Sequence, residues 1–108
     1  MKVRLSKAFT KSVDRLSGKQ LKSVLDVIVE TKAAQSIEDV SDCTRLVGYK
    51  NVYRIRIGNL RAFLTFHIEI IDGVAHFLFL VPRGQAYTKK TETELKRIDI
   101  KTTNHPND

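Results

Sequence analysis

The hydrophobic residues of this 108-residue chain follow two different periods, one in the front third and one after residue 45. Residues 2–5 alternate, which predicts a short strand, and Ser6 is placed to cap the helix that follows. Apolar residues recur at helical spacing in two runs, first Phe9, Val13 and Leu16, then Leu21, Val24, Leu25, Ile28 and Val29. Because only a short capping segment separates the runs, we expect two antiparallel helices with a shared core. A further helical turn is expected at Ser36–Val40.

After residue 45 the period changes to two, which is typical of strands. A short strand is predicted at 45–47, and two longer strands, 52–57 and 60–70, are joined by a turn at Gly58-Asn59. Residues 74–81 are almost entirely apolar, as in a central strand. We expect an α+β domain in which the first strand and the helical hairpin pack on one face of an antiparallel sheet of about four strands. The polar segment 89–108 is expected to form one short helix through Arg97 and then to fray.

The predicted turn determines which residues face one another across the hairpin. It pairs Ile57 with Leu60 and Ile55 with Ala62 on the core face, and Arg56 with Arg61 and Arg54 with Phe63 on the other face. Like charges directly opposite each other destabilise a strand pair, so Arg56 and Arg61 are expected to repel unless an anion lies between them. Arginine suits phosphate, because its planar guanidinium binds two oxygens and stays charged. The alternative is a solvent-facing, solubilising surface.

Charge narrows the class of partner. The chain carries 19 Lys and Arg residues against 12 Asp and Glu, a net charge of +7. Residues 44–90 hold eight basic residues against only Glu69 and Asp72. We therefore expect the positive field to come from this half, with a balanced front third, and the partner to be a nucleic acid or an acidic protein.

The remaining features of the composition exclude several classes of protein and of site. No apolar run is long enough to cross a bilayer and the N-terminus lacks a signal-peptide core, so a cytoplasmic protein with no membrane partner is expected. The single cysteine, Cys43, excludes an internal disulfide and is expected to pack rather than react. Metal-ligand spacing is absent among the histidines His67, His76 and His105. Neither a metal nor another cofactor is expected.

Three segments resemble the RelE/ParE toxin superfamily. They are Ser6–Val13, Arg45–Ala62 and the ending Arg83-x-x-x-Tyr87, and the string Tyr-Arg-Ile-Arg-Ile-Gly-Asn-x-Arg at 53–61 is the most specific part. The resemblance covers residues 1–88 as one toxin domain and leaves 89–108 as an extension outside the family pattern. Members of this superfamily are bacterial toxins that a cognate antitoxin holds inactive. The RelE branch cleaves mRNA in the ribosomal A site, whereas the ParE branch inhibits DNA gyrase.

The resemblance to the RelE branch implies catalytic roles for Arg54, Arg56, Arg61, Arg83 and Tyr87. In the implied reaction the 2′-OH of a nucleotide attacks the adjacent phosphorus, leaving a 2′,3′-cyclic phosphate and a 5′-OH. The first three arginines would neutralise the phosphate, Arg83 would stabilise or protonate the leaving oxygen, and Tyr87 would orient the base. Further RNA-binding residues are expected at Lys50, Phe63, Lys89 and Lys90.

One departure from the family concerns the general base. The best-known RelE site has lysines where this chain has Arg54 and Arg56, and arginine does not release its proton. Lys50, Tyr87 and the ribosomal RNA are the candidate bases. We expect a ribosome-dependent mRNA endonuclease that forms a heteromeric complex with an acidic antitoxin. The alternatives are a ParE-like gyrase inhibitor and a non-catalytic binding module.

Overall fold

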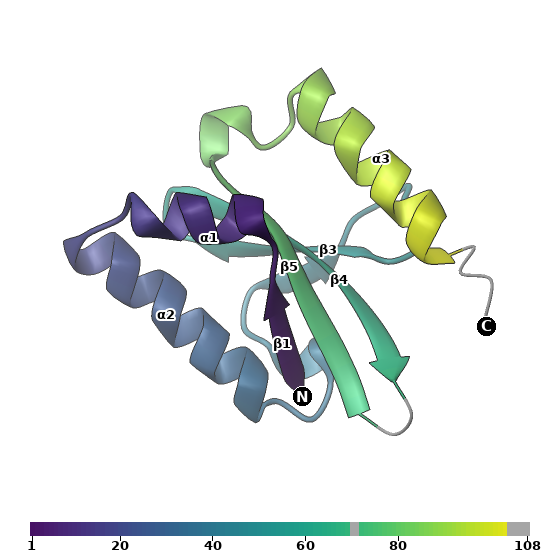
Figure 1. The fold of residues 1–108 in the computed structure, drawn as a ribbon, viewed down its shortest axis with the longest axis horizontal. Coiled ribbons are helices and arrows are strands. Elements are labelled where there is room, and N and C mark those ends of the chain that lie inside the picture. The colour runs from purple at the N-terminus through teal and green to yellow at the C-terminus, as the bar shows by residue number, and fades with distance from the viewer. Residues whose placement is uncertain (70–71, 104–108) are drawn as a thin grey trace.

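The computed structural model describes residues 1–69 and 72–103, which form a sheet with helices on both of its faces (Figure 1). The elements are β1 (Lys2–Leu5), α1 (Lys7–Asp14), α2 (Gly18–Ala33), η1 (Ile37–Asp39), β2 (Cys43–Arg45), β3 (Val52–Ile57), β4 (Leu60–Glu69), β5 (Asp72–Pro82), η2 (Arg83–Gln85) and α3 (Lys89–Thr103). The strand order is β1-β5-β4-β3-β2. The end of the predicted strand at Ile70 and the predicted fraying at 104–108 lie outside the described residues.

The sheet confirms the α+β class but differs from the prediction in two respects. It has five strands, and β1 runs parallel to β5 while the other neighbouring strands are antiparallel. The predicted purely antiparallel sheet of four strands is therefore wrong in detail. The reason is that β1 and β5 are not joined by a tight turn, since the helical hairpin and three strands separate them in the chain.

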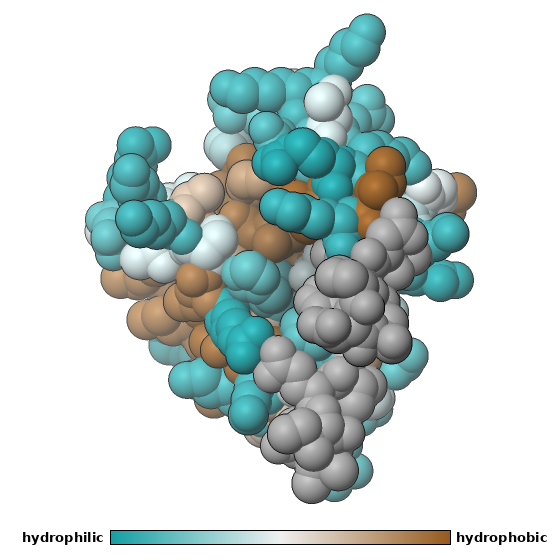
Figure 2. Space-filling view, turned by 45° about the vertical axis from the view of Figure 1, so that its right-hand side comes forward, coloured by the Kyte–Doolittle hydropathy of each residue, from teal (hydrophilic) through white to brown (hydrophobic). Residues whose placement is uncertain are grey.

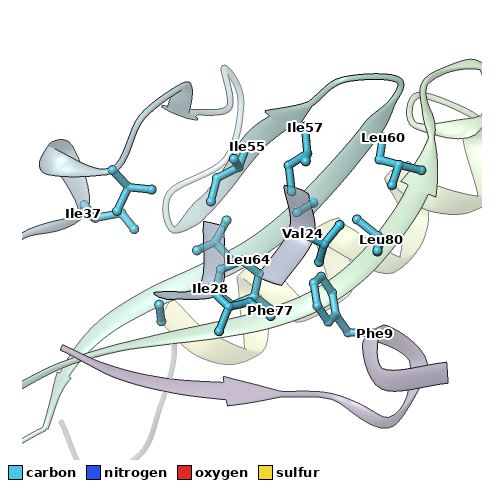
Figure 3. Packing of buried hydrophobic residues seen from close by; sticks show 13 residues of the cluster. Phe9, Val24, Ile28, Ile37, Ile55, Ile57, Leu60, Leu64, Phe77 and Leu80 are labelled. Carbon is cyan, nitrogen blue, oxygen red and sulfur yellow. The ribbon is translucent and has the colours of Figure 1, made fainter. Parts of the chain in front are cut away.

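The predicted helical hairpin forms and covers one face of the sheet. Ser6 caps α1, accepting a hydrogen bond from the backbone N–H of Phe9 (3.0 Å) and donating its hydroxyl to the carbonyl of Leu78 (2.6 Å). Phe9 is fully buried, with its ring centroid 5.2 Å from that of Phe77 on β5. Val24 and Ile28 of α2 complete this core against alternate residues of β3 and β4 (Figure 3).

The opposite face of the sheet is covered in part by α3. Leu95 of α3 is buried with Val52 of β3, Phe63 of β4, Leu78 of β5 and Ala86. The helical hairpin lies on one face as expected, whereas α3 lies on the other, and the expectation of a short helix ending near Arg97 is wrong because α3 runs to Thr103. The C-terminal extension forms a 15-residue helix and builds a second hydrophobic core.

A buried carboxylate fixes α3 to the loop before β3. Asp99 is only 6% exposed, and its two oxygens accept the backbone N–H groups of Lys50 (2.9 Å) and Asn51 (2.7 Å). One turn earlier, the ammonium of Lys96 contacts the carbonyl of Gly48 and lies 4.2 Å from the ring centroid of Tyr49. The two backbone N–H groups satisfy the buried carboxylate of Asp99. Together with the Lys96 contacts they join α3 to the loop before β3.

The surface mixes hydrophilic and hydrophobic regions. Figure 2 shows hydrophobic residues gathered in a band on one side of the visible face, with hydrophilic residues above and below it. None of the helices in residues 1–69 and 72–103 combines the length and the apolar character that crossing a membrane requires.

Candidate functional site

The β3–β4 hairpin places Arg56 and Arg61 on the face that α3 shares. The observed register pairs Arg56 with Arg61 and Arg54 with Phe63, as the turn predicted. The turn itself has the expected form, because Gly58 adopts φ +57 and Asn59 does not have a positive φ. The two arginines therefore meet at the end of the sheet nearest this turn.

Arg61 is held by the backbone beside it. Its Nη1 donates to the carbonyls of Gly58 (2.8 Å) and Leu60 (2.9 Å), and the residue is only 9% exposed. Arg56, in contrast, is exposed. Arg61 is therefore expected to contribute to stability despite its like-charged neighbour, since its guanidinium satisfies two carbonyls of the turn.

The segment after β5 brings the other two pocket residues to the same place. The backbone N–H of Arg83 donates to the carbonyl of Asn59 (2.8 Å), which ties η2 to the tip of the hairpin. The side chains of Arg56, Arg61, Arg83 and Tyr87 then line one pocket of about 360 Å³. Three guanidinium groups and a phenol thus converge from two segments that lie more than 20 residues apart in the sequence.

Tyr87 is oriented by two neighbours on the sheet. Its hydroxyl accepts a hydrogen bond from Nη1 of Arg54 (2.7 Å), and its ring meets that of Phe63 edge-on, with the centroids 6.3 Å apart. The residue as a whole is 51% exposed. Part of the ring therefore remains available to a ligand while the side chain is held in one orientation.

The other predicted site residues lie elsewhere. Phe63 is fully buried beneath α3, so its predicted contact with RNA is wrong: alternation placed it on the correct face, but that face is covered. Lys50 lies in the loop before β3, where its backbone N–H donates to Asp99, and it is not among the residues that line the pocket. Lys89 and Lys90 are exposed in the first turn of α3, close to Tyr87 in the chain.

The remaining reactive side chains do not form a second centre. Burial, followed by the charge of Glu38, raises the pKa of Cys43 to about 11, so the thiol stays protonated and packs against the first core. Burial and then the charges of Arg4 and His67 lower the pKa of His76. No group of three His, Cys, Asp or Glu residues suited to a metal ion exists in the part of the chain that is described, and His105 lies outside it.

The front third is less balanced than the charge sum along the chain suggested. Residues 1–25 hold seven basic residues against Asp14, whereas residues 26–43 hold five acidic residues against Lys32. Averaging over both stretches concealed this separation. Lys7, Lys11 and Arg15 are exposed on and just after α1 and add to the positive charge of the surface outside the pocket.

Comparison with known proteins confirms the family. No family profile matches the chain. The chain is 37% identical over 62 residues to the toxin RelE3 of Methanocaldococcus jannaschii, an alignment that covers 56% of this chain and 70% of the relative. Its fold matches the crystal structure of the RelB–RelE antitoxin–toxin complex from Methanococcus jannaschii, with a TM-score of 0.61, 25% identity and coverage of 78% of this chain and 94% of that one.

A second solved structure agrees in fold. The archaeal RelE–RelB complex from Pyrococcus horikoshii OT3 matches with a TM-score of 0.61 and 24% identity, covering 79% of this chain and 97% of that one. The resemblance first suggested by the string at 53–61 therefore extends to the three-dimensional structure. Because the 37% identity to RelE3 spans more than two thirds of that toxin, this chain belongs to the RelE toxin family.

Proposed function

We propose that the protein is a toxin that cleaves mRNA in the ribosomal A site and that an acidic antitoxin holds inactive. The observation that carries this proposal is the convergence of Arg56, Arg61, Arg83 and Tyr87 on one pocket. The charge of this pocket suits a phosphodiester, because arginine binds phosphate oxygens in pairs and remains charged at any physiological pH. Action on ribosomes places the toxin in the cytoplasm.

The pocket supplies the cationic groups that the proposed reaction needs to stabilise negative charge. The 2′-OH of a nucleotide loses its proton and attacks the adjacent phosphorus, while the bond from phosphorus to the 5′-oxygen breaks and that oxygen takes up a proton. Arg56 and Arg61 bind the non-bridging oxygens, on which negative charge develops, and Arg83 stabilises the negative charge of the leaving oxygen, which takes its proton from water. The exposed part of the Tyr87 ring stacks on the base.

The general base in this proposal is Tyr87 or a group of the ribosomal RNA. The pocket is lined by three arginines and Tyr87, and Lys50 is not one of its lining residues. Tyr87 or a group of the ribosomal RNA then accepts the proton of the 2′-OH. Dependence on the ribosome follows in either case, because the ribosome positions the mRNA and completes the site.

The pocket favours cleavage over the two alternatives. A toxin that inhibits gyrase by binding, like a non-catalytic module, needs no pocket lined by three arginines and an oriented tyrosine. The antitoxin remains part of the proposal because two structural neighbours are RelE toxins in complex with RelB. An acidic antitoxin fits the net charge of +7.

Mapping transcript ends after induced expression tests the proposal. The toxin is expected to produce cuts inside translated codons, and the cuts are expected to disappear when translation initiation on the reporter is blocked. The Arg45→Gln variant serves as the matched control, because Arg45 is an exposed arginine of β2 outside the pocket. Intact mRNA together with induction of the DNA-damage response would contradict the proposal and favour the ParE-like alternative.

A further inference from the structure

The four arginines that the family resemblance groups together divide into two kinds in the structure. Arg56, Arg61 and Arg83 line the pocket, whereas Arg54 does not. Arg54 lies behind Tyr87, where its Nη1 donates to the phenol oxygen over 2.7 Å. The Nη1 of Arg54 is therefore already engaged by a side chain of the protein.

The setting of Arg54 also argues against direct contact with RNA. Its Nε is buried and has no hydrogen-bond partner among the described residues. Because this nitrogen has almost no exposed surface, it is not accessible to a phosphate group. The hydrogen bond to Tyr87 is the one side-chain hydrogen bond that the structure gives Arg54 within the described residues.

Arg54 and Phe63 act together on Tyr87. The two residues are direct partners in the β3–β4 register, and each contacts Tyr87: Arg54 at the hydroxyl, Phe63 at the ring edge. Phe63 is fully buried and therefore fixed. The pair thus determines both the orientation of the Tyr87 ring and the position of its hydroxyl. Tyr87 lies in a short connection between η2 and α3, which does not restrict its side chain by itself.

We propose that Arg54 is a positioning residue that holds Tyr87 in the pocket through its hydroxyl, rather than a residue that binds the scissile phosphate. This inference rests on the proposed function, since it assigns a role within the same reaction. It replaces the role that the family resemblance implied for Arg54. In this arrangement Arg54 contributes to cleavage only through Tyr87, and the remaining three arginines account for phosphate binding.

A double-mutant cycle in a ribosome-dependent cleavage assay tests the inference. Tyr87→Phe removes only the hydroxyl, and Arg54→Met removes the donor while keeping a side chain of similar length. Each is expected to lower kcat about tenfold, because a misplaced group loses its effect on the transition state. The double variant is expected to be no slower than either single variant, because both remove the same contact.

The outcomes of the cycle are distinct. Multiplying losses, about a hundredfold in the double variant, would overturn the inference, because Arg54 would then act on the phosphate independently of Tyr87. An Arg54→Met variant as active as wild type would overturn it as well. The control is Arg45→Met, which removes a strand arginine outside the pocket and is expected to leave kcat unchanged.

A measurement without cleavage separates this inference from the proposed function. The chain has three tyrosines, so 3-fluorotyrosine labelling gives three ¹⁹F signals, and the one lost in Tyr87→Phe belongs to Tyr87. Arg54→Met is expected to shift or broaden this signal and to leave that of Tyr49 unchanged. A Tyr87 signal that does not respond to Arg54→Met would overturn the inference even if mRNA is cleaved. A response in a protein that cleaves no mRNA would support it and refute the proposed function instead.

Discussion

Arg56 and Arg61 lie directly opposite each other across the β3–β4 hairpin, but only Arg61 is held by the carbonyls of the turn. The pair thus combines an exposed arginine with a nearly buried one in the same pocket. Substituting each of them distinguishes a contribution to cleavage from a contribution to the fold.

Arg61→Ala is expected to lower both stability and activity. Loss of its two hydrogen bonds costs about 1 kcal/mol in the free energy of unfolding, after subtraction of the relieved repulsion from Arg56. Loss of a cationic donor at the transition state lowers cleavage on the order of a hundredfold. Urea unfolding and ribosome-dependent cleavage measure the two effects. A variant that is as stable as wild type would contradict the role of the turn carbonyls, and one that is equally active would contradict the role in the pocket.

Arg56→Ala is expected to lower cleavage activity without lowering the stability of the fold. Because the side chain is exposed, its loss changes the free energy of unfolding by less than about 0.5 kcal/mol. Cleavage is still expected to fall on the order of a hundredfold, as for Arg61. The same two assays apply. Equal cleavage by Arg56→Ala and wild type would show that the exposed arginine only solubilises the strand.

Asp99→Asn is expected to destabilise the protein by about 1–3 kcal/mol, because the amide presents an N–H group toward backbone N–H donors. The matched control is Glu94→Gln, which alters a carboxylate on the same helix whose ion pair among the described residues is with Arg97. The control is expected to change stability by less than about 0.5 kcal/mol. Urea unfolding curves compare the two, and equal stabilities would show that Asp99 does not fix α3.

Cys43 is expected to resist alkylation near neutral pH. Its pKa is raised from 9.0 to about 11, mainly by burial, so little thiolate is present below pH 9. Since the folded pKa exceeds the unfolded one, the protonated thiol favours the native state below pH 9, and this contribution is lost as the pH rises through about 11. The rate of iodoacetamide labelling of Cys43 is compared between folded and urea-unfolded protein, and labelling of the folded protein is expected to be slower. Equal labelling rates at pH 8 would contradict it.

The antitoxin complex is expected to weaken with salt. An acidic partner that neutralises exposed arginines loses attraction as the Debye length falls, so raising the salt from about 50 to 500 mM should raise Kd at least about tenfold. We expect this partner to cover the Arg54, Arg56 and Arg61 face or to displace the C-terminal segment. Isothermal titration at several salt concentrations measures the dependence. A salt-independent complex that contacts neither the hairpin face nor α3 would contradict the expectation.

Local patterns predicted the parts of the structure that local contacts determine. The Gly58-Asn59 turn predicted the hairpin register correctly, because a two-residue loop allows only one pairing of the flanking strands. Ser6, as the capping residue, predicted the start of α1. The register placed Arg56 opposite Arg61, and the resemblance added Arg83 and Tyr87, so the pocket residues were among those predicted.

The errors about the second face of the sheet trace to α3, and the error about β1 traces to its pairing with β5; both sets of contacts are distant in sequence. The polar composition of α3 conceals a buried stripe, and Asp99 is satisfied by backbone groups of residues almost 50 positions earlier. Without that helix Phe63 is expected to be accessible, whereas with it the side chain is fully buried. A strand pattern indicates on which face a residue lies, but not what covers that face.

Cleavage of a defined mRNA on purified ribosomes tests the central claim most directly. Wild-type toxin is expected to cut the codon in the A site and to leave a 2′,3′-cyclic phosphate on the upstream fragment. A single 2′-deoxy substitution at the cut nucleotide is expected to abolish the reaction, as is the Arg56→Ala, Arg61→Ala, Arg83→Ala triple variant. Cleavage that persists on the 2′-deoxy mRNA, or in the triple variant, would contradict the account.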